Sequence, residues 1–216
     1  MRTMRTRIKV CGITDPEEAL AIAALGVDAL GFIFAPASPR LVEVELVQAI
    51  VATLPPLVDA VGVFLDHDPA LVNEIAKACR LSLIQLHGHE SPDYCRAMVR
   101  PVLKAFRVRE GALPELSPYR GLVKGVLLDT YRSGQAGGTG ATFDWGLVGR
   151  LTPPGPVLLA GGLTPNNVGQ AIRQARPFAV DVNSGVEVAP GRKDLEQVRR
   201  LVAEVRQADQ AIYPLN

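Results

Sequence analysis

Short apolar runs alternate with longer amphipathic segments along the whole chain. The apolar runs are rich in branched aliphatic residues and predict β-strands near residues 7–11, 28–34, 60–65, 82–86, 102–106, 123–129, 156–160 and 178–183. Amphipathic patterns predict helices near residues 15–25, 43–53, 68–78, 91–99, 165–175 and 193–208, with weaker helical segments at 112–119 and 144–150. Because parallel neighbouring strands need a crossover connection, this alternation predicts a parallel sheet covered by helices.

Residues at the ends of the helical segments support these boundaries. Asp15, Ser91 and Thr164 are each followed by a proline, which is the order expected of a capping residue and the first helical position. Gly26 follows the first segment, at the position after a helix where a residue with left-handed backbone conformation is expected.

The number of strand–helix units sets the fold class. Eight units in 216 residues predict an α/β fold, a (β/α)8 TIM barrel that forms a single domain over residues 1–216. A doubly wound open sheet is the competing fold, but it usually has fewer strands, and no G-x-G-x-x-G motif follows the first strand here.

Composition narrows the class of protein. Apolar residues make up 48% of the chain, charged residues 21%, and the formal net charge is +1, so nothing suggests nucleic acid or an anionic membrane as a partner. No apolar run approaches the roughly 18 residues that span a bilayer, and the start of the chain lacks a secretory pattern. With only three cysteines, we expect a cytoplasmic protein with reduced thiols.

Polar residues and glycines gather where the predicted strands end, which in a TIM barrel is the active-site end. Gly161 and Gly162 follow the seventh strand, and Ser184 and Gly185 follow the eighth, the two loops that often hold phosphate. Glycine lets backbone N–H groups approach an anion, although each glycine alone is more often a simple turn residue. Together they predict a phosphate site.

Cys11 ends the first strand and Asp129 ends the sixth. The simplest interpretation is a small buried thiol and a turn or capping carboxylate. At one rim, however, a thiol of lowered pKa and a carboxyl group of raised pKa form a base and an acid suited to an isomerase. Cys79 and Cys95 lie in helical segments and are predicted to be packing residues.

Three other side chains receive predictions. Arg40 follows the second strand and either is a solvated surface charge or binds a substrate carboxylate. His87 directly follows the fourth strand and is more often a structural histidine than a substrate ligand, whereas His67 and His89 look exposed. No cluster of histidine, cysteine and carboxylate residues has metal-ligand spacing, so we expect no metal.

Strand alternation places two charges inside the barrel. Lys9 is in phase with Cys11, and Asp181 with Asn183, on strands that are neighbours in a closed barrel. Because neither charge is expected to be buried alone, we predict a buried Lys9–Asp181 ion pair, in which Lys9 could also help lower the pKa of Cys11.

The motifs KVCGITDPEEAL, GFIFAPASPR, VGVF, QLHG, LLDT, GGTGATFDW, LAGGLTPNNV and DVNSGVE run in order from residue 9 to 187. Their combination resembles the phosphoribosylanthranilate isomerase family of tryptophan biosynthesis. The resemblance implies that Cys11 is the general base, Asp129 the general acid and Arg40 the contact to the anthranilate moiety. It also implies phosphate binding by Gly161, Gly162 and Gly185. From their positions at the strand ends and in the loops, His87, Asp181 and Ser184 are further candidate substrate-binding residues. Asn183 departs from the family pattern, where serine is more usual.

The implied reaction is an Amadori rearrangement of a small phosphorylated substrate without any cofactor, and a homodimer is one possible assembly. The glycine-rich segment Tyr131–Thr142 could close over the substrate. Indole-3-glycerol phosphate synthase is an alternative, but it uses a lysine acid. A dual isomerase acting also on a histidine-pathway analogue would carry an aspartate in place of Cys11. A ligand-binding barrel without activity is the third alternative.

Overall fold

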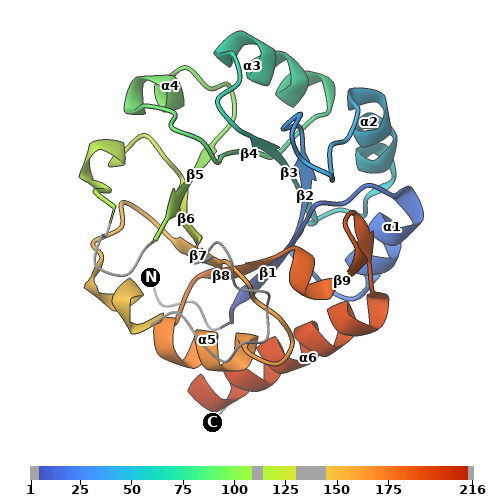
Figure 1. Ribbon diagram of the computed structural model, residues 1–216, viewed down its shortest axis with the longest axis vertical. Helices are drawn as coiled ribbons and strands as arrows, with labels where there is room; N and C mark the ends of the chain where they lie inside the picture. Colours follow the sequence, from blue (N-terminus) through green and yellow to red (C-terminus); the bar gives the residue numbers. More distant parts are fainter. Residues whose placement is uncertain (1–4, 109–113, 130–144, 214–216) are drawn as a thin grey trace.

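Eight parallel strands close into a barrel in the computed structural model of the protein, which describes residues 5–108, 114–129 and 145–213. The predicted barrel is confirmed and the open sheet is excluded, because β8 pairs with β1 and closes the ring seen in Figure 1. Each predicted strand lies within two residues of the observed bounds. The strands are β1 (Arg7–Cys11), β2 (Ala29–Ile33), β3 (Asp59–Phe64), β4 (Leu83–Leu86), β5 (Val102–Arg107), β6 (Gly125–Asp129), β7 (Val157–Ala160) and β8 (Ala179–Val182).

Helices surround the barrel and cover the outer faces of its strands (Figure 1). The two weak helical segments form only 3-10 turns, at Ser117–Tyr119 and Trp145–Arg150. The helices are α1 (Pro16–Ala24), α2 (Val44–Thr53), α3 (Pro69–Ala78), α4 (Pro92–Arg96), α5 (Val168–Ala175) and α6 (Leu195–Ile212). None of the helices in the described ranges has the length and apolar character needed to cross a membrane.

Local capping explains most helix starts and one wrong prediction. The side chains of Asp15 and Ser91 accept hydrogen bonds from the third following backbone N–H, at 2.9 and 3.2 Å, as the sequence predicts. The Thr164 prediction is wrong, because α5 begins only at Val168. The intervening turn is closed by Asn167, whose side-chain Oδ1 accepts a hydrogen bond from the Thr164 N–H at 2.8 Å.

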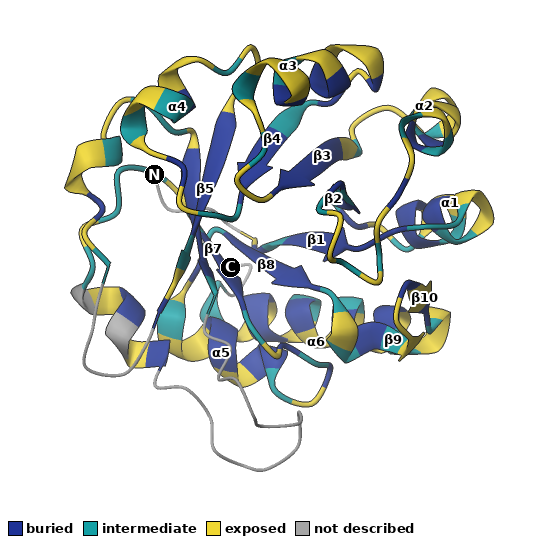
Figure 2. Cartoon of the chain, turned by 45° about the horizontal axis from the view of Figure 1, so that its top comes forward, coloured by how far each residue is buried: buried dark blue, intermediate teal, exposed yellow. Residues whose placement is uncertain are grey.

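Two apolar layers hold the barrel together. The smaller one fills its interior and includes Val61, Leu103 and Leu127, whereas the larger one lies between strands and helices and includes Phe32, Ile84 and Leu86. Figure 2 shows buried residues along the strands and exposed residues on the outer faces of the helices. Since both faces of each strand are covered, the strands are nearly continuous apolar runs, which is the pattern that predicts them. Truncating a fully buried leucine of this kind to alanine costs about 2–5 kcal/mol.

A short hairpin separates the last strand from the last helix and was not predicted. After β8, a 3-10 turn at Ser184–Val186 leads into the antiparallel strands β9 (Glu187–Ala189) and β10 (Arg192–Lys193). The hairpin brings Glu187 and Lys193 back to the barrel mouth, where both side chains are almost completely buried.

Candidate active site

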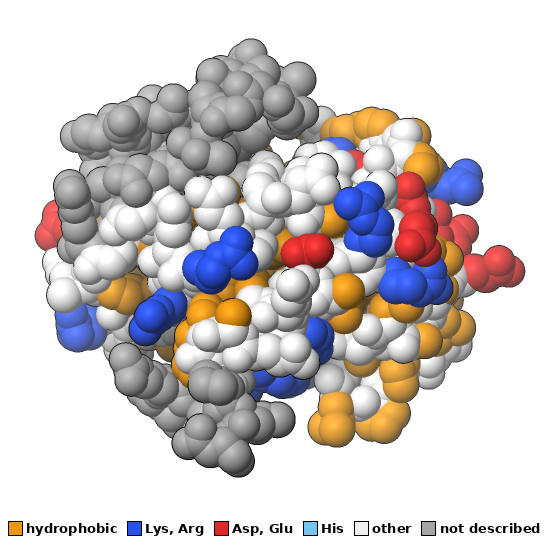
Figure 3. All heavy atoms as spheres, turned by 90° about the horizontal axis from the view of Figure 1, so that it is seen from below, with side chains coloured by type: hydrophobic (Ala, Val, Ile, Leu, Met, Phe, Trp, Pro, Cys, Tyr) orange, Lys and Arg blue, Asp and Glu red, His pale blue; other side chains and the backbone are white. Residues whose placement is uncertain are grey.

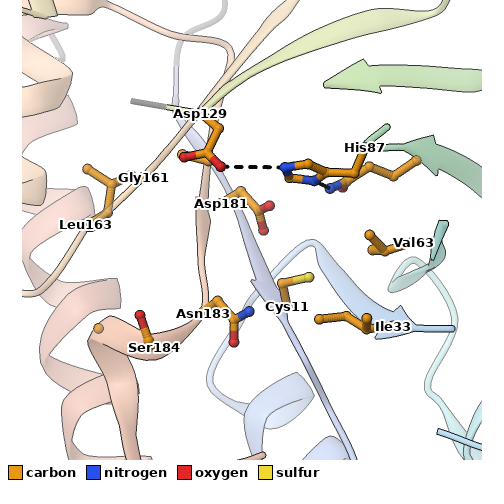
Figure 4. Close-up of a pocket in the computed structure, with 14 residues that line it drawn as sticks. Cys11, Ile33, Val63, His87, Asp129, Gly161, Leu163, Asp181, Asn183 and Ser184 are labelled. Carbon is orange, nitrogen blue, oxygen red and sulfur yellow. Dashed lines mark hydrogen bonds and ion pairs between the residues drawn. The ribbon is translucent and has the colours of Figure 1, made fainter. Parts of the chain in front are cut away.

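A cavity of about 190 Å³ opens at the carboxyl ends of the barrel strands. The predicted site residues come together there: eight of the nine line this one cavity, and Arg40 lies outside it. In Figure 4 the side chains of Cys11, His87, Asp129 and Asp181 surround a common space. The eight are Cys11, His87, Asp129, Gly161, Gly162, Asp181, Ser184 and Gly185.

A larger cavity of about 340 Å³ lies at the opposite end of the barrel. It is lined by residues at strand starts, such as Arg7, Asp59 and Lys124, together with apolar side chains of the barrel interior. In a TIM barrel, reactive groups are expected at the carboxyl ends of the strands. Size alone would therefore select the wrong cavity, whereas the placement of thiol, imidazole and carboxyl groups selects the smaller one.

Cys11 is the last residue of β1 and is only 5% exposed. Burial raises the pKa of its thiol, because a thiolate is poorly solvated there, while the ammonium group of Lys9 acts in the opposite direction. Lys9 therefore lowers the pKa of Cys11 as expected, but burial raises it by more. The help expected from Lys9 is thus present, but the pKa of Cys11 is not lowered overall.

The predicted Lys9–Asp181 ion pair is confirmed. The β1–β8 register places the two residues opposite each other, and Lys9 Nζ lies 2.9 Å from Asp181 Oδ1 with side chains 3% and 8% exposed. Burial acts to lower the pKa of Lys9, but the charge of Asp181 and the hydrogen bond to it act to raise it, and the pKa lies above its ordinary value. Lys9 therefore stays a cation directly beneath the thiol.

Asp129 ends β6 and faces His87, which follows β4. His87 Nε2 lies 3.4 Å from Asp129 Oδ2, and His87 Nδ1 lies 3.2 Å from the side-chain Nε2 of Gln85 (Figure 4). Gln85 is 1% exposed and lines the cavity. The sequence predicted no role for it, although it belongs to the Q-L-H-G motif. The side chains of Gln85, His87 and Asp129 therefore form a chain of contacts from the amide through the imidazole to the carboxyl group.

The glycine loops after β7 and β8 pack directly against each other. Gly161 and Gly162 both have positive φ, +95° and +65°, a region that glycine adopts without steric cost. A Cβ on Gly185 would lie 1.9 Å from the Leu163 carbonyl oxygen, so only glycine fits against the β7 loop. The amide of Asn167 donates to the Gly162 carbonyl at 3.0 Å and holds this turn. Both glycine loops line the cavity.

Arg40 lies beside the mouth and is bound by Glu187. Its Nε and Nη2 atoms donate to the two Glu187 carboxylate oxygens at 2.8 and 2.6 Å. The sequence offered no signal for this partner, because Glu187 belongs to the unpredicted hairpin. The guanidinium is therefore an ordered side chain, 17% exposed, and the interpretation as a solvated surface charge is wrong.

Comparison with known proteins shows the family of the chain. A family model described as N-(5'-phosphoribosyl)anthranilate (PRA) isomerase matches residues 8–204. The chain belongs to the N-(5'-phosphoribosyl)anthranilate isomerase family. The N-(5'-phosphoribosyl)anthranilate isomerase of Trichlorobacter lovleyi is 49% identical over 204 residues, covering 94% of this chain and 98% of that protein.

Solved structures of the family share the fold. The crystal structure of phosphoribosyl anthranilate isomerase from Thermus thermophilus has a TM-score of 0.82 at 40% identity, covering 94% of this chain and 99% of that one. A phosphoribosyl anthranilate isomerase in complex with reduced 1-(o-carboxyphenylamino)-1-deoxyribulose 5-phosphate has a TM-score of 0.78 at 36% identity, with the same coverage. The chain is thus an isomerase by family.

The remaining predictions for individual residues have mixed outcomes. Cys79 and Cys95 are buried as expected, and burial raises the pKa of each thiol to about 11. His89 is exposed as predicted, but His67 is half-buried against the Phe64 ring and contacts the Phe34 carbonyl, so that prediction is wrong. The segment Tyr131–Thr142 lies outside the described residues. Among the residues that are described, no group of histidine, cysteine and carboxylate side chains is arranged to hold a metal.

Proposed function

We propose that this protein converts N-(5-phosphoribosyl)anthranilate to 1-(2-carboxyphenylamino)-1-deoxyribulose 5-phosphate, a step of tryptophan biosynthesis. Family membership supports the substrate class. The observation that carries the mechanism is that Cys11 and Asp129, from β1 and β6, line one cavity together with the glycine loops. An acid and a base around a single sugar, with its phosphate bound at backbone amides, are the parts that an aldose–ketose isomerisation needs.

Asp129 is the proposed acid of the first step. Its carboxyl group protonates the ring oxygen of the furanose, the bond from that oxygen to C1 breaks, and an iminium forms between C1 and the anthranilate nitrogen. His87 is 3.4 Å away and is placed to stabilise the resulting carboxylate. The proposed reaction needs no cofactor, because the iminium nitrogen accepts the electron pair released in the next step.

Cys11 is the proposed base of the second step. Its thiolate removes the proton from C2, and the bonding electrons form the C1–C2 double bond of an enolamine. The enolamine becomes the ketone when C1 gains a proton and the hydroxyl group on C2 loses one. Lys9 and Lys193 both act to lower the pKa of Cys11 against the effect of burial, so they favour the reactive thiolate.

A fluorescence assay of substrate consumption tests the proposal. We expect the parent protein to consume N-(5-phosphoribosyl)anthranilate, and Cys11→Ser and Asp129→Asn each to lower kcat by about 10²–10⁴-fold, the usual contribution of an acid or base. Cys95→Ser and Asp59→Asn are matched controls, because one replaces a buried packing thiol and the other a carboxylate at the opposite end of the barrel. Circular dichroism verifies that each variant folds.

The outcomes separate the parts of the proposal. A parent protein that leaves this substrate unchanged refutes the activity. Near-parental kcat in a folded Cys11→Ser or Asp129→Asn variant removes that residue from its role. A loss of activity in the control variants as large as in the site variants would show that any thiol or carboxylate change disturbs the protein.

A further inference from the structure

Arg40 uses only two of the N–H donors of its guanidinium to bind Glu187. A guanidinium has five N–H donors. The Nε donor and one Nη2 donor face the Glu187 carboxylate. Within the described part of the chain, Nη1 has no hydrogen-bond partner. The edge formed by Nη1 and the second Nη2 hydrogen therefore remains, and this fork matches a second carboxylate bidentately.

The position of Arg40 relative to the cavity is fixed by close packing. A Cβ on Gly12 would lie 2.7 Å from Arg40 Cδ and 2.7 Å from Asn183 Oδ1, so the arginine stem crosses the backbone directly after Cys11. Asn183 lines the cavity on its other side. The guanidinium is thus held next to the proposed base, one side chain away from the cavity.

Lys193 changes the charge of this cluster. Its Nζ donates to Glu187 Oε1 at 2.7 Å and to Asn183 Oδ1 at 3.0 Å, with a side chain that is 0% exposed. Arg40 and Glu187 alone form a neutral pair, which attracts a further anion weakly. With Lys193 added, the three groups carry a net charge of +1 next to the cavity, and a substrate carboxylate offsets it.

The β9–β10 hairpin holds the carboxylate of Glu187 in place. The backbone N–H of Gly191 donates to Glu187 Oε1 at 3.2 Å, and the Thr14 hydroxyl donates to the Gly191 carbonyl at 2.6 Å. The hairpin is therefore bound to the loop after β1, and Glu187 accepts hydrogen bonds from three residues, Arg40, Gly191 and Lys193. A carboxylate used only for surface solubility would not have this set of partners.

We propose that Glu187 and Lys193 are positioning residues for the carboxylate of the anthranilate moiety: Glu187 orients the guanidinium of Arg40, and Lys193 offsets the charge of Glu187. This inference rests on the proposed function and extends it, because it assigns substrate selectivity to a hairpin whose residues do not line the cavity.

Two substrates that differ only in the carboxylate test the inference. Steady-state kinetics are measured with N-(5-phosphoribosyl)anthranilate and with N-(5-phosphoribosyl)aniline, for the parent and for Glu187→Gln, Lys193→Met and Arg40→Met. We expect Glu187→Gln and Lys193→Met to raise KM for the anthranilate substrate by about ten- to a hundredfold, the range of a charge-assisted hydrogen bond. Glu187→Gln leaves kcat little changed, whereas Lys193→Met also lowers kcat by the same factor for both substrates, because Lys193 lowers the pKa of Cys11. For the aniline substrate, KM does not change in either variant. Glu196→Gln on α6 is the control, because this exposed carboxylate pairs with Arg199 on the same helix.

Each outcome has one meaning. An equal rise in KM for both substrates in folded Glu187→Gln and Lys193→Met, or no rise for either, overturns the inference. If Arg40→Met also loses both substrates equally, the role of Arg40 in the proposed function fails as well. A selective loss in Arg40→Met alone leaves that role intact and refutes only the positioning role. Should Glu187→Gln not fold, Glu187→Asp replaces it: a selective rise in KM for the anthranilate substrate supports the inference, and parental selectivity overturns it.

Discussion

Two buried lysine–carboxylate pairs lie in opposite halves of the barrel, and they differ in the groups that surround them. Lys9–Asp181 joins β1 to β8, and Lys104–Glu90 joins β5 to the loop after β4. Both lysines are 2% exposed, and their Nζ atoms lie 2.9 and 3.0 Å from the carboxylate oxygens. Burial and pairing are therefore the same in both halves.

The neighbours of each lysine make the difference. Lys9 lies beneath Cys11 and acts on the pKa of that thiol. Lys104 instead donates to the backbone carbonyls of Leu86, Gly88 and Ala105, and Glu90 accepts from the Gly88 N–H. A buried ion pair by itself is weak grounds for assigning function. In the proposed mechanism, direct contact with a thiol that lines the cavity distinguishes Lys9–Asp181 from Lys104–Glu90, whose lysine contacts backbone carbonyls.

Removing Lys9 is expected to have the largest effect. Lys9→Met leaves Asp181 as an unpaired buried charge, which costs about 3–5 kcal/mol of unfolding free energy. The same change raises the pKa of Cys11 further, and each unit lowers the thiolate fraction tenfold. We expect the ascending limb of kcat/KM against pH to move to higher pH. An unshifted limb in folded protein would mean that Lys9 is structural like Lys104.

Removing Lys104 is expected to affect stability alone. Lys104→Met leaves Glu90 unpaired and lowers the free energy of unfolding by a similar 3–5 kcal/mol or so, measured by urea denaturation. The kcat of the protein that remains folded should equal that of the parent. A fall in kcat as large as that of Lys9→Met would contradict the division between the two halves.

The sequence predicts those features that follow the regular alternation of residues along a strand, and it misses those that lie in loops and turns. The strands and the Lys9–Asp181 pair follow strand alternation, which fixes the face of every second residue. Glu90 lies in a loop and Glu187 in a hairpin after a 3-10 turn, where no period applies, so the partners of Lys104 and Arg40 were missed. The start of α5 was placed too early because a proline after threonine also fits the turn that Asn167 closes.

Double replacements sharpen the comparison further. When both charges of a buried pair become neutral groups of similar size, most of the lost stability returns. We expect Lys104→Met with Glu90→Gln to recover unfolding free energy at full activity. Lys9→Met with Asp181→Asn should recover stability but reverse only part of the shift in the pH dependence of kcat/KM, because Asp181 raises the pKa of Cys11 by less than Lys9 lowers it. Complete recovery of both properties in the second double variant would speak against a role for Lys9 at the thiol.

The third buried lysine pair, Lys193–Glu187, predicts a smaller pH effect. Burial acts to raise the pKa of Glu187, but Arg40 and Lys193 lower it below its ordinary value of 4.5. A carboxylate with a lowered folded-state pKa adds stability above its ordinary pKa, and this stability is lost as the pH falls below it. We expect the parent to lose more unfolding free energy than Glu187→Gln between about pH 5 and pH 3. Parallel losses would show that the carboxylate is not stabilised by its two cations.

The central claim is that Cys11 and Asp129 act on one bound sugar, and a crystal structure with the reduced product analogue tests it most directly. The account predicts the analogue in the cavity at the carboxyl ends of the strands, with its C2 carbon beside Cys11 Sγ and its C4 hydroxyl beside the Asp129 carboxyl group. Its phosphate should lie at the backbone N–H groups of the glycine loops after β7 and β8. An analogue bound in the cavity at the opposite end, or with its C2 carbon turned away from the sulfur, would contradict the account.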